Sequence, residues 1–254
     1  MRLEGKTAIV TGAARGTGAE IARLFVDEGA TVIVADVLDE RGKATAAEIG
    51  ATYHHLDVTD EEGWAGLVGG LDSLDVLVNN AAVLHLATID LTTAEAFDRI
   101  YRVNVLGAFL GTKACLPLLR ASGRGSIVNL GSIDSVTGTA LTAAYTSSKF
   151  AMRGLTKVTT LENKRFGVRC NIVCPAAGNR EMHPPIVGAE DWPMPPVDAS
   201  RGPVAVAPAA VFFASDESSL CNGTELVLDG GYSAGMAMDL PDSVYGIGRA
   251  PMPG

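Results

Sequence analysis

The chain alternates short apolar, β-branched runs with longer segments whose apolar residues recur at helical spacing. Strands are predicted at residues 7–10, 31–35, 53–56, 76–78, 126–130, 168–173 and 226–228, and helices at 16–28, 41–49, 94–119 and 145–166. Gly107 and Gly111 are positions where the third helix could be interrupted. This alternation predicts a parallel sheet with helices on both faces. Because no repeat or linker divides the pattern, we expect one domain over residues 1–254.

Two segments break the alternation. His183–Pro203 holds six of the 12 prolines in 21 residues, so it cannot form one regular helix. A long irregular insertion in a compact domain is often functional, and we expect a lid over the substrate at about residues 180–205. The tail Tyr232–Gly254 is rich in Gly, Pro and Met. It is expected either to fray or to dock on another subunit.

Composition narrows the function. Of 254 residues, 47% are hydrophobic and 19% charged, enough to bury a sizeable core. The net charge of -9 disfavours nucleic-acid and membrane-surface partners. The most apolar run, Val204–Ala214, contains Pro208 and is too short to cross a bilayer, and the N-terminus is charged where a signal peptide is apolar. We therefore expect a cytoplasmic protein.

Cysteines and histidines give no sign of a metal site. Cys170 and Cys174 lie on one predicted strand, about 13 Å apart, too far for a disulfide or a shared metal ion. The four histidines lack the spacing of metal ligands. We expect buried thiols and no metal.

A glycine-rich turn, Thr11–Gly18, connects the first strand and helix. Glycine permits positive φ and lets backbone N–H groups approach a pyrophosphate, whose charge the helix N-terminus stabilises. Asp36 ends the second strand, where a carboxylate accepts hydrogen bonds from ribose hydroxyls and repels a 2′-phosphate. This favours NAD over NADP, although Arg15 in the turn is a signal for NADP.

Polar residues also follow the next two strands. Asp57 and Val58 come after the third strand, where the carboxylate could accept from the adenine amine. Asn79-Asn80-Ala81-Ala82 follows the fourth, at the carboxyl edge where ligands bind in open α/β sheets. Asn79 and Asn80 would equally suit a turn at the end of a strand.

Four residues predict an acid–base site. Tyr145 and Lys149 are four residues apart and share a helical face. A tyrosine base needs its pKa lowered from about 10, which a neighbouring ammonium and a nicotinamide cation would favour. Ser132, just after the fifth strand, could hold the substrate oxygen beside the phenol. Asn104 could anchor a water next to Lys149 and complete a proton path.

Together, the turn Thr11-Gly12-x-x-x-Gly16-x-Gly18, Asn79-Asn80-Ala81, Ser132 and Tyr145-x-x-x-Lys149 resemble the short-chain dehydrogenase/reductase family, from Gly5 to Gly231. The resemblance implies a doubly wound Rossmann-type domain, a seven-stranded parallel sheet of order 3-2-1-4-5-6-7, and a homotetramer. It implies Tyr145 as base or acid, Lys149 lowering its pKa and binding ribose, Ser132 orienting substrate, and Asn104 holding a relay water. Ala35–Glu40, His55–Thr59 and Arg153–Lys157 are similar to bacterial NAD-dependent hydroxysteroid dehydrogenases of the 3α,20β type.

Three features depart from the family pattern. Ala82 replaces a glycine, and residues 61–74 are about one helical turn shorter than in the steroid relatives. After the sixth strand, Arg180 replaces the threonine that binds the carboxamide. We expect the backbone of Val173–Ala177 to orient the nicotinamide ring, with Arg180 turned to the pyrophosphate or the pocket mouth. The residues expected to bind the cofactor are Gly12, Arg15, Gly16, Thr17, Gly18, Asp36, Val37, Asp57, Val58, Asn80, Ala81, Ala82, Tyr145, Lys149, Pro175, Ala176, Ala177 and Gly178.

The sequence therefore predicts an NAD-dependent dehydrogenase of a bulky apolar secondary alcohol. A steroid is the first choice, oxidised at the 17β, 3α or 20β position, followed by smaller alicyclic alcohols. Reduction of 3-oxoacyl thioesters is an alternative that Asp36 disfavours, and a catalytically idle NAD-binding protein is a remote one. The expected pocket residues are Val83, Leu84, Ile133, Val136, Ala140, Leu141, Met182, Trp192 and Met194.

Overall fold

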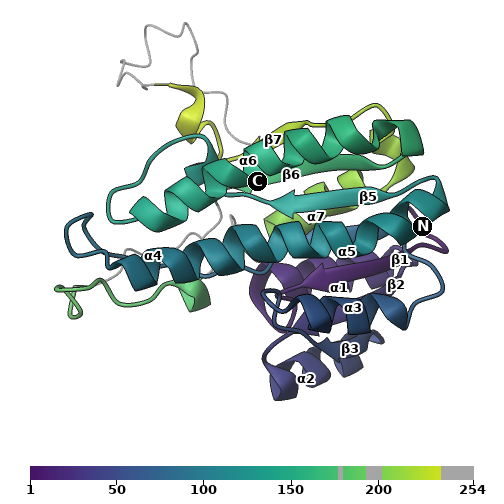
Figure 1. Ribbon diagram of the computed structural model, residues 1–254, viewed down its shortest axis with the longest axis horizontal. Coiled ribbons are helices and arrows are strands. Elements are labelled where there is room, and N and C mark those ends of the chain that lie inside the picture. The colour runs from purple at the N-terminus through teal and green to yellow at the C-terminus, as the bar shows by residue number, and fades with distance from the viewer. Residues whose placement is uncertain (177–179, 193–201, 236–254) are drawn as a thin grey trace, which may run out of the picture.

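The computed structural model describes residues 1–176, 180–192 and 202–235, which leaves the predicted contacts of Ala177, Gly178 and Met194 and most of the predicted tail outside the described residues. Seven parallel strands form one sheet in the order β3-β2-β1-β4-β5-β6-β7 (Figure 1). This confirms the fold class and the strand order predicted from the sequence. The strands are β1 Thr7–Thr11, β2 Thr31–Asp36, β3 Thr52–His55, β4 Val76–Asn79, β5 Ser126–Leu130, β6 Arg169–Pro175 and β7 Glu225–Leu228.

Helices cover both faces of this sheet. On one face α1 (Gly16–Asp27), α2 (Asp39–Ile49) and α7 (Pro203–Ala214) share a core cluster with β1, β2 and β4. On the other face α3 (Glu61–Gly69) and α5 (Gly107–Ser122) pack in a second cluster around Trp64. Helix α6 (Ala143–Asn163) packs beside them against β6. Neighbouring strand residues serve opposite faces, as Ile9 and Val10 do on β1, because side chains alternate along a strand.

The predicted helix over 94–119 is present but interrupted at a different place. Helix α4 (Ala94–Tyr101) passes into a π-helical turn, η1 (Arg102–Leu106), before α5 begins at Gly107. Gly111 lies inside α5 without breaking it. A glycine is needed there because Trp64 occupies the space that a side chain would take. A single π-turn often marks a functional position, and this one carries Asn104.

The combined helical stretch Ala94–Ser122 is long and apolar enough to cross a membrane, judged by length and composition alone. In the fold, however, its C-terminal part packs against the sheet, with Leu110, Cys115 and Leu119 buried in the core. The amino-acid pattern of this stretch is therefore accounted for by core packing.

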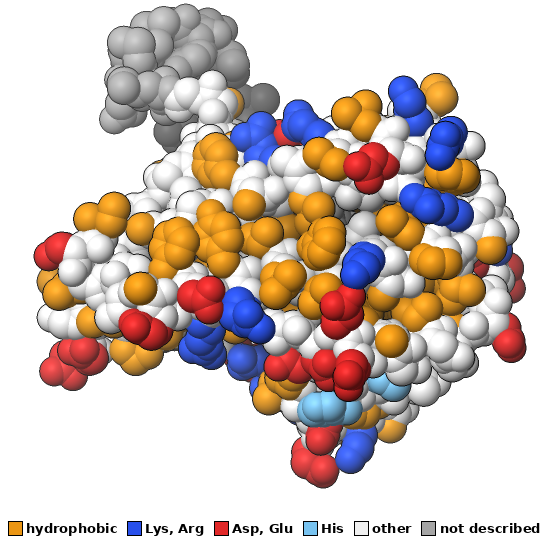
Figure 2. Space-filling model, viewed as in Figure 1, with side chains coloured by type: hydrophobic (Ala, Val, Ile, Leu, Met, Phe, Trp, Pro, Cys, Tyr) orange, Lys and Arg blue, Asp and Glu red, His pale blue; other side chains and the backbone are white. Residues whose placement is uncertain are grey.

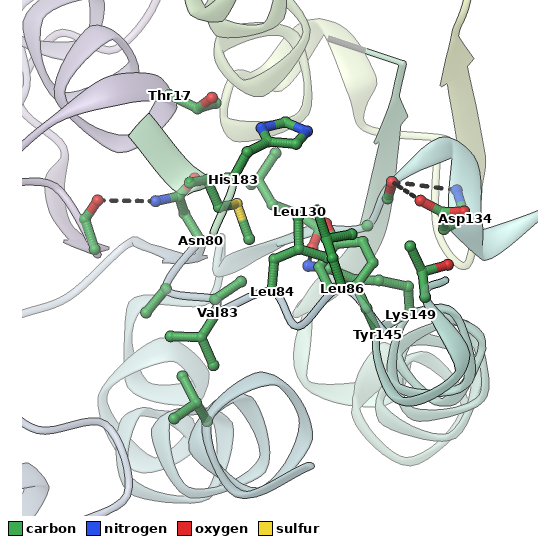
Figure 3. A pocket seen from close by; sticks show the side chains of 18 of the residues that line it. Thr17, Asn80, Val83, Leu84, Leu86, Leu130, Asp134, Tyr145, Lys149 and His183 are labelled. Carbon is green, nitrogen blue, oxygen red and sulfur yellow. Dashed lines mark hydrogen bonds between the residues drawn. The ribbon is translucent and has the colours of Figure 1, made fainter. Parts of the chain in front are cut away.

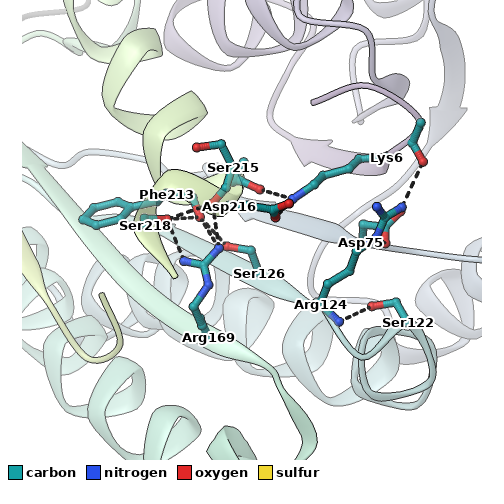
Figure 4. Close-up of polar contacts among 12 residues, drawn as sticks. Lys6, Asp75, Ser122, Arg124, Ser126, Arg169, Phe213, Ser215, Asp216 and Ser218 are labelled. Carbon is teal, nitrogen blue, oxygen red and sulfur yellow. Dashed lines mark hydrogen bonds and ion pairs between the residues drawn. The ribbon is translucent and has the colours of Figure 1, made fainter. Parts of the chain in front are cut away.

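Buried cations cap the C-terminal end of α7 at the edge of the sheet remote from the carboxyl ends of its strands (Figure 4). Arg169 donates to the carbonyls of Phe213 and Ser215, both at 3.0 Å, and to the Ser218 hydroxyl at 2.7 Å. Lys6 donates to the Ala214 carbonyl at 3.0 Å. These bonds satisfy carbonyls that have no partner within the helix, and positive charge is favourable at a helix C-terminus.

Candidate active site

A cavity of about 850 Å³ lies along the carboxyl ends of the strands. The parallel register brings these ends to one edge, since Thr11 pairs with Ala35 and Asn79 pairs with Asn129. Figure 3 shows Thr17 and Asn80 at one end of the cavity and Tyr145 and Lys149 toward the other. One cavity therefore connects the predicted nucleotide turn with the predicted acid–base pair.

The glycine-rich turn is held rigidly by its neighbours. The Asn80 side-chain amide donates to the carbonyls of Thr11 and Gly12 at 2.8 and 3.0 Å. Gly12 has a φ of +63°, and a side chain at Gly18 would collide with the Gly12 carbonyl and lie 2.5 Å from Asn80 Nδ2. Helix α1 then begins without a side-chain cap, which leaves its N-terminal N–H groups for a ligand. This cradle fits the pyrophosphate of a dinucleotide.

Asp36 lines the cavity at the end of β2, where the sequence predicts a ribose acceptor. Its carboxylate is 8% exposed and accepts from the backbone N–H groups of Ala14 at 2.9 Å and Leu38 at 3.0 Å. These bonds fix the carboxylate in place. Asp57 and Val58 line the same end of the cavity, and the Thr59 N–H and hydroxyl both donate to Asp57, each at 2.8 Å.

Arg15, the residue whose charge favours NADP, is not an isolated cation. Its guanidinium lies 3.4 Å from the carboxylate of Glu181, which also pairs with Arg41 at 2.9 Å. Both arginines hold the pKa of Glu181 below its usual value. Glu181 belongs to the short 3-10 helix η4 (Arg180–Met182) after β6, so this ion-pair cluster joins the start of the predicted lid to the nucleotide end.

Tyr145 and Lys149 lie on the buried face of α6, as their spacing predicts. The Lys149 ammonium donates to the Leu130 carbonyl at 2.7 Å and lies 5.5 Å from the centre of the Tyr145 ring. Ser132 lines the cavity beside them and is the N-cap of the 3-10 turn η2 (Ile133–Ser135). The three side chains that the sequence singles out for acid–base chemistry are therefore brought together at one wall.

The pKa values of this pair differ in part from the sequence expectation. Burial raises the pKa of Tyr145, a hydrogen bond with Ser132 opposes that rise, and the negative charge of Asp134 adds to it. Burial lowers the pKa of Lys149 to about 8. The expected lowering for Tyr145 assumed that charge would dominate, whereas desolvation is the larger effect among the protein's own groups.

The hydrogen bonds of Asn104 go to Val83 and Ser148 and none goes to Lys149. Its side-chain oxygen accepts from the Val83 N–H at 2.8 Å, and its amide donates to the Val83 carbonyl at 3.0 Å and to Ser148 Oγ at 3.1 Å. Asn104 therefore ties the cavity wall at Val83 to α6 next to Lys149. The relay water expected beside it stays a prediction.

Most of the predicted residues line the cavity. Of the predicted cofactor residues, Gly16 and Gly18 do not line it, and Ala177 and Gly178 lie outside the described part of the chain. Of the predicted pocket, Val136 does not line it, because the turn η2 presents Ile133 and Asp134 there instead. The lining residues that the sequence did not single out for this site are Leu38, Leu56, Leu86, Arg99, Val103, Leu130, Gly131, Asp134, Thr139, Thr142, His183 and Ile186.

The thiols are buried or half-buried, as the sequence predicts. Cys115, Cys170 and Cys174 are buried and free, and Cys221 is half-buried and free. Burial raises the pKa of Cys115 and of Cys170, each to about 12. Within residues 1–176, 180–192 and 202–235, no group of three or more His, Cys, Asp or Glu residues has the arrangement of a metal site.

Comparison with known proteins supplies the context. Residues 12–233 match the family model described as enoyl-(acyl carrier protein) reductase. The chain is 43% identical over 242 residues to a 3-alpha-(or 20-beta)-hydroxysteroid dehydrogenase of Mycobacterium bovis, covering 93% of this chain and 92% of that protein. It is 39% identical to a cyclopentanol dehydrogenase of a Comamonas species, covering 92% and 99%. It is 34% identical to a trans-4-hydroxycyclohexanecarboxylate dehydrogenase of Sinomonas cyclohexanicum, covering 92% and 95%.

Proposed function

Because the chain belongs to the short-chain dehydrogenase/reductase family, we propose that it is an NAD-dependent dehydrogenase of a bulky apolar secondary alcohol, with a steroid as the first candidate. The chain is an oxidoreductase that acts on the CH–OH group of small molecules with a nicotinamide cofactor. The proposal concerns the choice of NAD and of the substrate. The observation that carries it is the single cavity joining Asp36 to Ser132, Tyr145 and Lys149.

The residues at the reacting end divide the work between them. Tyr145 takes the proton of the substrate hydroxyl, and Ser132 holds the substrate oxygen beside the phenol. The Lys149 ammonium favours the phenolate electrostatically from 5.5 Å. Asn104 positions the wall at Val83 and the part of α6 that carries Lys149. A bound nicotinamide supplies the hydride acceptor and, when oxidised, a positive charge.

Charge at the nucleotide end supports the choice of NAD. Asp36 holds a fixed carboxylate at the end of β2, where the sequence predicts the adenosine ribose, and Glu181 pairs with Arg15 and Arg41 and offsets one of their two positive charges. At about 4 Å and an effective dielectric constant near 20, one pair of like charges repels by about 4 kcal/mol. We therefore expect NAD⁺ to be preferred over NADP⁺. In Asp36→Ser the ratio of kcat/KM with NAD⁺ to kcat/KM with NADP⁺ should fall at least about a hundredfold. An unchanged ratio would mean that another residue selects the cofactor.

The substrate end is apolar and partly formed by the proline-rich segment. Met182, Ile186 and Trp192 line the cavity, and the Val187 N–H donates to the Leu86 carbonyl at 2.9 Å. We propose that this segment acts as the lid. The apolar side chains facing the substrate are Val83, Leu84, Leu86, Ile133, Ala140, Leu141, Met182, Ile186 and Trp192.

A homotetramer is also part of the proposal. Helices α4, α5 and α6 present apolar side chains on one open face of the molecule (Figure 2). Exposed apolar patches of this kind mark protein–protein contacts, and closed homo-oligomers are the common solution. The residues on these helices with 40–65% exposure are Phe97, Phe109, Phe150, Val158 and Leu161.

The test is a substrate panel measured as reduction of NAD⁺ and of NADP⁺. It contains steroid alcohols hydroxylated at 3α, 17β or 20β, cyclopentanol and cyclohexanol, and an acetoacetyl thioester in the reverse direction. Turnover of a steroid with NAD⁺ supports the full proposal, and turnover of cyclic alcohols alone removes the steroid. Turnover of the thioester alone would favour the reductase alternative.

The Tyr145→Phe variant separates an enzyme from an idle cofactor-binding protein. An enzyme keeps its affinity for NAD⁺ but loses turnover by about 100-fold or more, because the proton acceptor is gone. We expect this loss of turnover while the temperature of thermal unfolding stays the same as in the parent protein. Equal turnover in the variant and the parent protein would refute the acid–base role.

A further inference from the structure

Asp134 is a carboxylate in the wall of the substrate end of the cavity that the roles above leave unused. It lies in the turn η2, two residues after Ser132, and is 8% exposed. In Figure 3 it lies beyond Tyr145 and Lys149 from the nucleotide residues Thr17 and Asn80. A charged side chain in this otherwise largely apolar end needs a physical explanation, since burying a carboxylate without strong partners is unfavourable.

The hydrogen bonds that Asp134 accepts are weak. Ser132 Oγ and Thr146 Oγ1 donate to its two oxygens at 3.4 and 3.3 Å, whereas an ordinary O–H···O bond is about 2.7–2.8 Å long. Among the side chains that the structure describes, no Lys, Arg or His forms an ion pair with it. Other buried carboxylates are better served: Asp36 accepts two N–H bonds at 2.9 and 3.0 Å, and Asp75 accepts an N–H at 3.0 Å and pairs with an arginine at 2.8 Å.

This negative charge also opposes the proposed reaction. Asp134 raises the pKa of Tyr145 and stabilises the charged form of Lys149. The first effect works against the phenolate that alcohol oxidation requires. A hydrogen-bond donor that arrives with the substrate would shield the carboxylate and would also satisfy its oxygens.

We propose that Asp134 accepts a hydrogen bond from a second hydroxyl group of the substrate, so that the preferred substrate is a diol. This inference rests on the proposed alcohol dehydrogenase function and specifies its substrate class. Thr142 lines the cavity and shares a 2.7 Å hydrogen bond with Thr146, which donates to Asp134, so the wall is polar at the carboxylate itself without further charge. The polar wall suits a neutral hydroxyl.

The geometry limits how far apart the two hydroxyl groups are. Ser132 Oγ lies 3.4 Å from Asp134 Oδ2. If Ser132 and Asp134 each bind one substrate oxygen through a bond of about 2.8 Å, the two oxygens lie at most about 9 Å apart. Vicinal and 1,3-diols of one ring fit this limit, as do hydroxyls on adjoining rings. Hydroxyls at the two ends of a four-ring skeleton do not.

The experiment compares diols with matched monohydric alcohols, using NAD⁺. Cyclohexanol is paired with cis- and trans-1,2-cyclohexanediol, and cyclopentanol with the 1,2-cyclopentanediols. In the parent protein we expect a higher kcat/KM for at least one diol than for its monohydric partner. In Asp134→Ala that ratio should fall about 10- to 100-fold, the range of a hydrogen bond to a charged group.

Two further variants distinguish binding from a structural effect. Asp134→Asn keeps the shape and one acceptor oxygen, so its diol ratio should lie between those of the parent protein and Asp134→Ala. Thr137→Val alters the same turn, by removing its hydroxyl bond to the Ile133 carbonyl, and should leave the ratio unchanged. Because the bond to the second hydroxyl also shields the carboxylate that raises the pKa of Tyr145, the loss of the diol advantage should appear in kcat as well as in KM.

The outcomes separate the two proposals. A diol ratio that stays the same in Asp134→Ala and Asp134→Asn, with both substrate types still turned over, would overturn the role of Asp134 and leave the dehydrogenase intact. Absence of turnover with every alcohol in the parent protein would overturn the proposed function, and the diol inference with it. A fall in the ratio confined to the Asp134 variants would support both.

Discussion

Replacing Lys149 with methionine removes one charge from the reacting wall while keeping a side chain of similar length. The ammonium of Lys149 is 3% exposed, is held by the Leu130 carbonyl at 2.7 Å and lies 5.5 Å from the centre of the Tyr145 ring. Its position is therefore fixed by a single strong hydrogen bond. Removal of the charge should act on Tyr145 through the electric field, since no hydrogen bond directly joins the two side chains.

The size of the effect follows from that distance. If the phenolate charge is placed at the ring centre, 5.5 Å from Lys149 Nζ, the two unit charges attract by about 3 kcal/mol at an effective dielectric constant near 20, which corresponds to about two units in the pKa of Tyr145. The acid limb of kcat/KM for alcohol oxidation should therefore move up by one to two pH units in Lys149→Met. Near neutral pH this amounts to a loss of about 10- to 100-fold. Since burial lowers the pKa of Lys149 to about 8, the advantage of the parent protein over Lys149→Met should shrink as the pH rises above that value.

The assay is the pH dependence of NAD⁺ reduction at saturating cofactor, which removes any change in cofactor affinity from the comparison. Lys157→Met is the matched control, because Lys157 lies two helical turns further along α6 and pairs with Glu225 on the surface. The control should keep the parent profile. An acid limb at the same pH in Lys149→Met and in the parent protein would refute an electrostatic role for Lys149.

Two further predictions concern the nucleotide turn and the fold. Gly18→Ala should abolish NAD⁺ binding in a calorimetric titration, because the new methyl group would lie 2.5 Å from Asn80 Nδ2 and collide with backbone. Gly66 lies on an exposed part of α3 with open space around it, so Gly66→Ala should keep NAD⁺ binding and stabilise the protein by about 1 kcal/mol. Arg169→Met should lower the free energy of unfolding in urea by about 2 kcal/mol, since the carbonyls of Phe213 and Ser215 each lose a charged donor and keep only serine hydroxyls. Arg2→Met, which breaks an exposed ion pair, should change it little. Equal NAD⁺ binding by the two glycine variants, or equal free energies of unfolding for the two arginine variants, would contradict these packing arguments.

The sheet was predictable because each strand leaves a local signal. A strand buried on both faces is a short run of mostly apolar and β-branched residues, a pattern that does not depend on the rest of the fold. The predicted bounds of β5, Ser126–Leu130, match the structure. Helix α7 was not predicted. It is apolar on all sides and contains Pro208, so it has no amphipathic period, and only its packing against both α1 and the sheet explains its composition. The π-turn at Arg102–Leu106 likewise has no periodic signature.

The cavity residues divide in the same way. Asp36 was identified because it ends a strand and the parallel topology fixes where strand ends lie, and Lys149 because its spacing from Tyr145 places both on one helical face. Asp134 was missed because its exposure to the cavity depends on how the three-residue turn η2 is folded. The pairing of Arg15 with Glu181 was also missed, because the two residues are 166 positions apart in the chain. Signals of this kind depend on loop geometry and leave no spacing in the sequence.

The pKa values of the reacting pair connect these observations to the order of events. Burial disfavours charge on either partner: it raises the pKa of Tyr145 and lowers that of Lys149. Without ligands the protein therefore favours a neutral phenol at Tyr145, beside a Lys149 whose ammonium loses its proton more readily than usual. The carboxylate of Asp134 further disfavours the phenolate. In the proposed reaction, positive charge from an oxidised cofactor and the proposed substrate donor to Asp134 would both act against that bias. Proton transfer to Tyr145 would therefore be most favourable in the complex that holds both ligands.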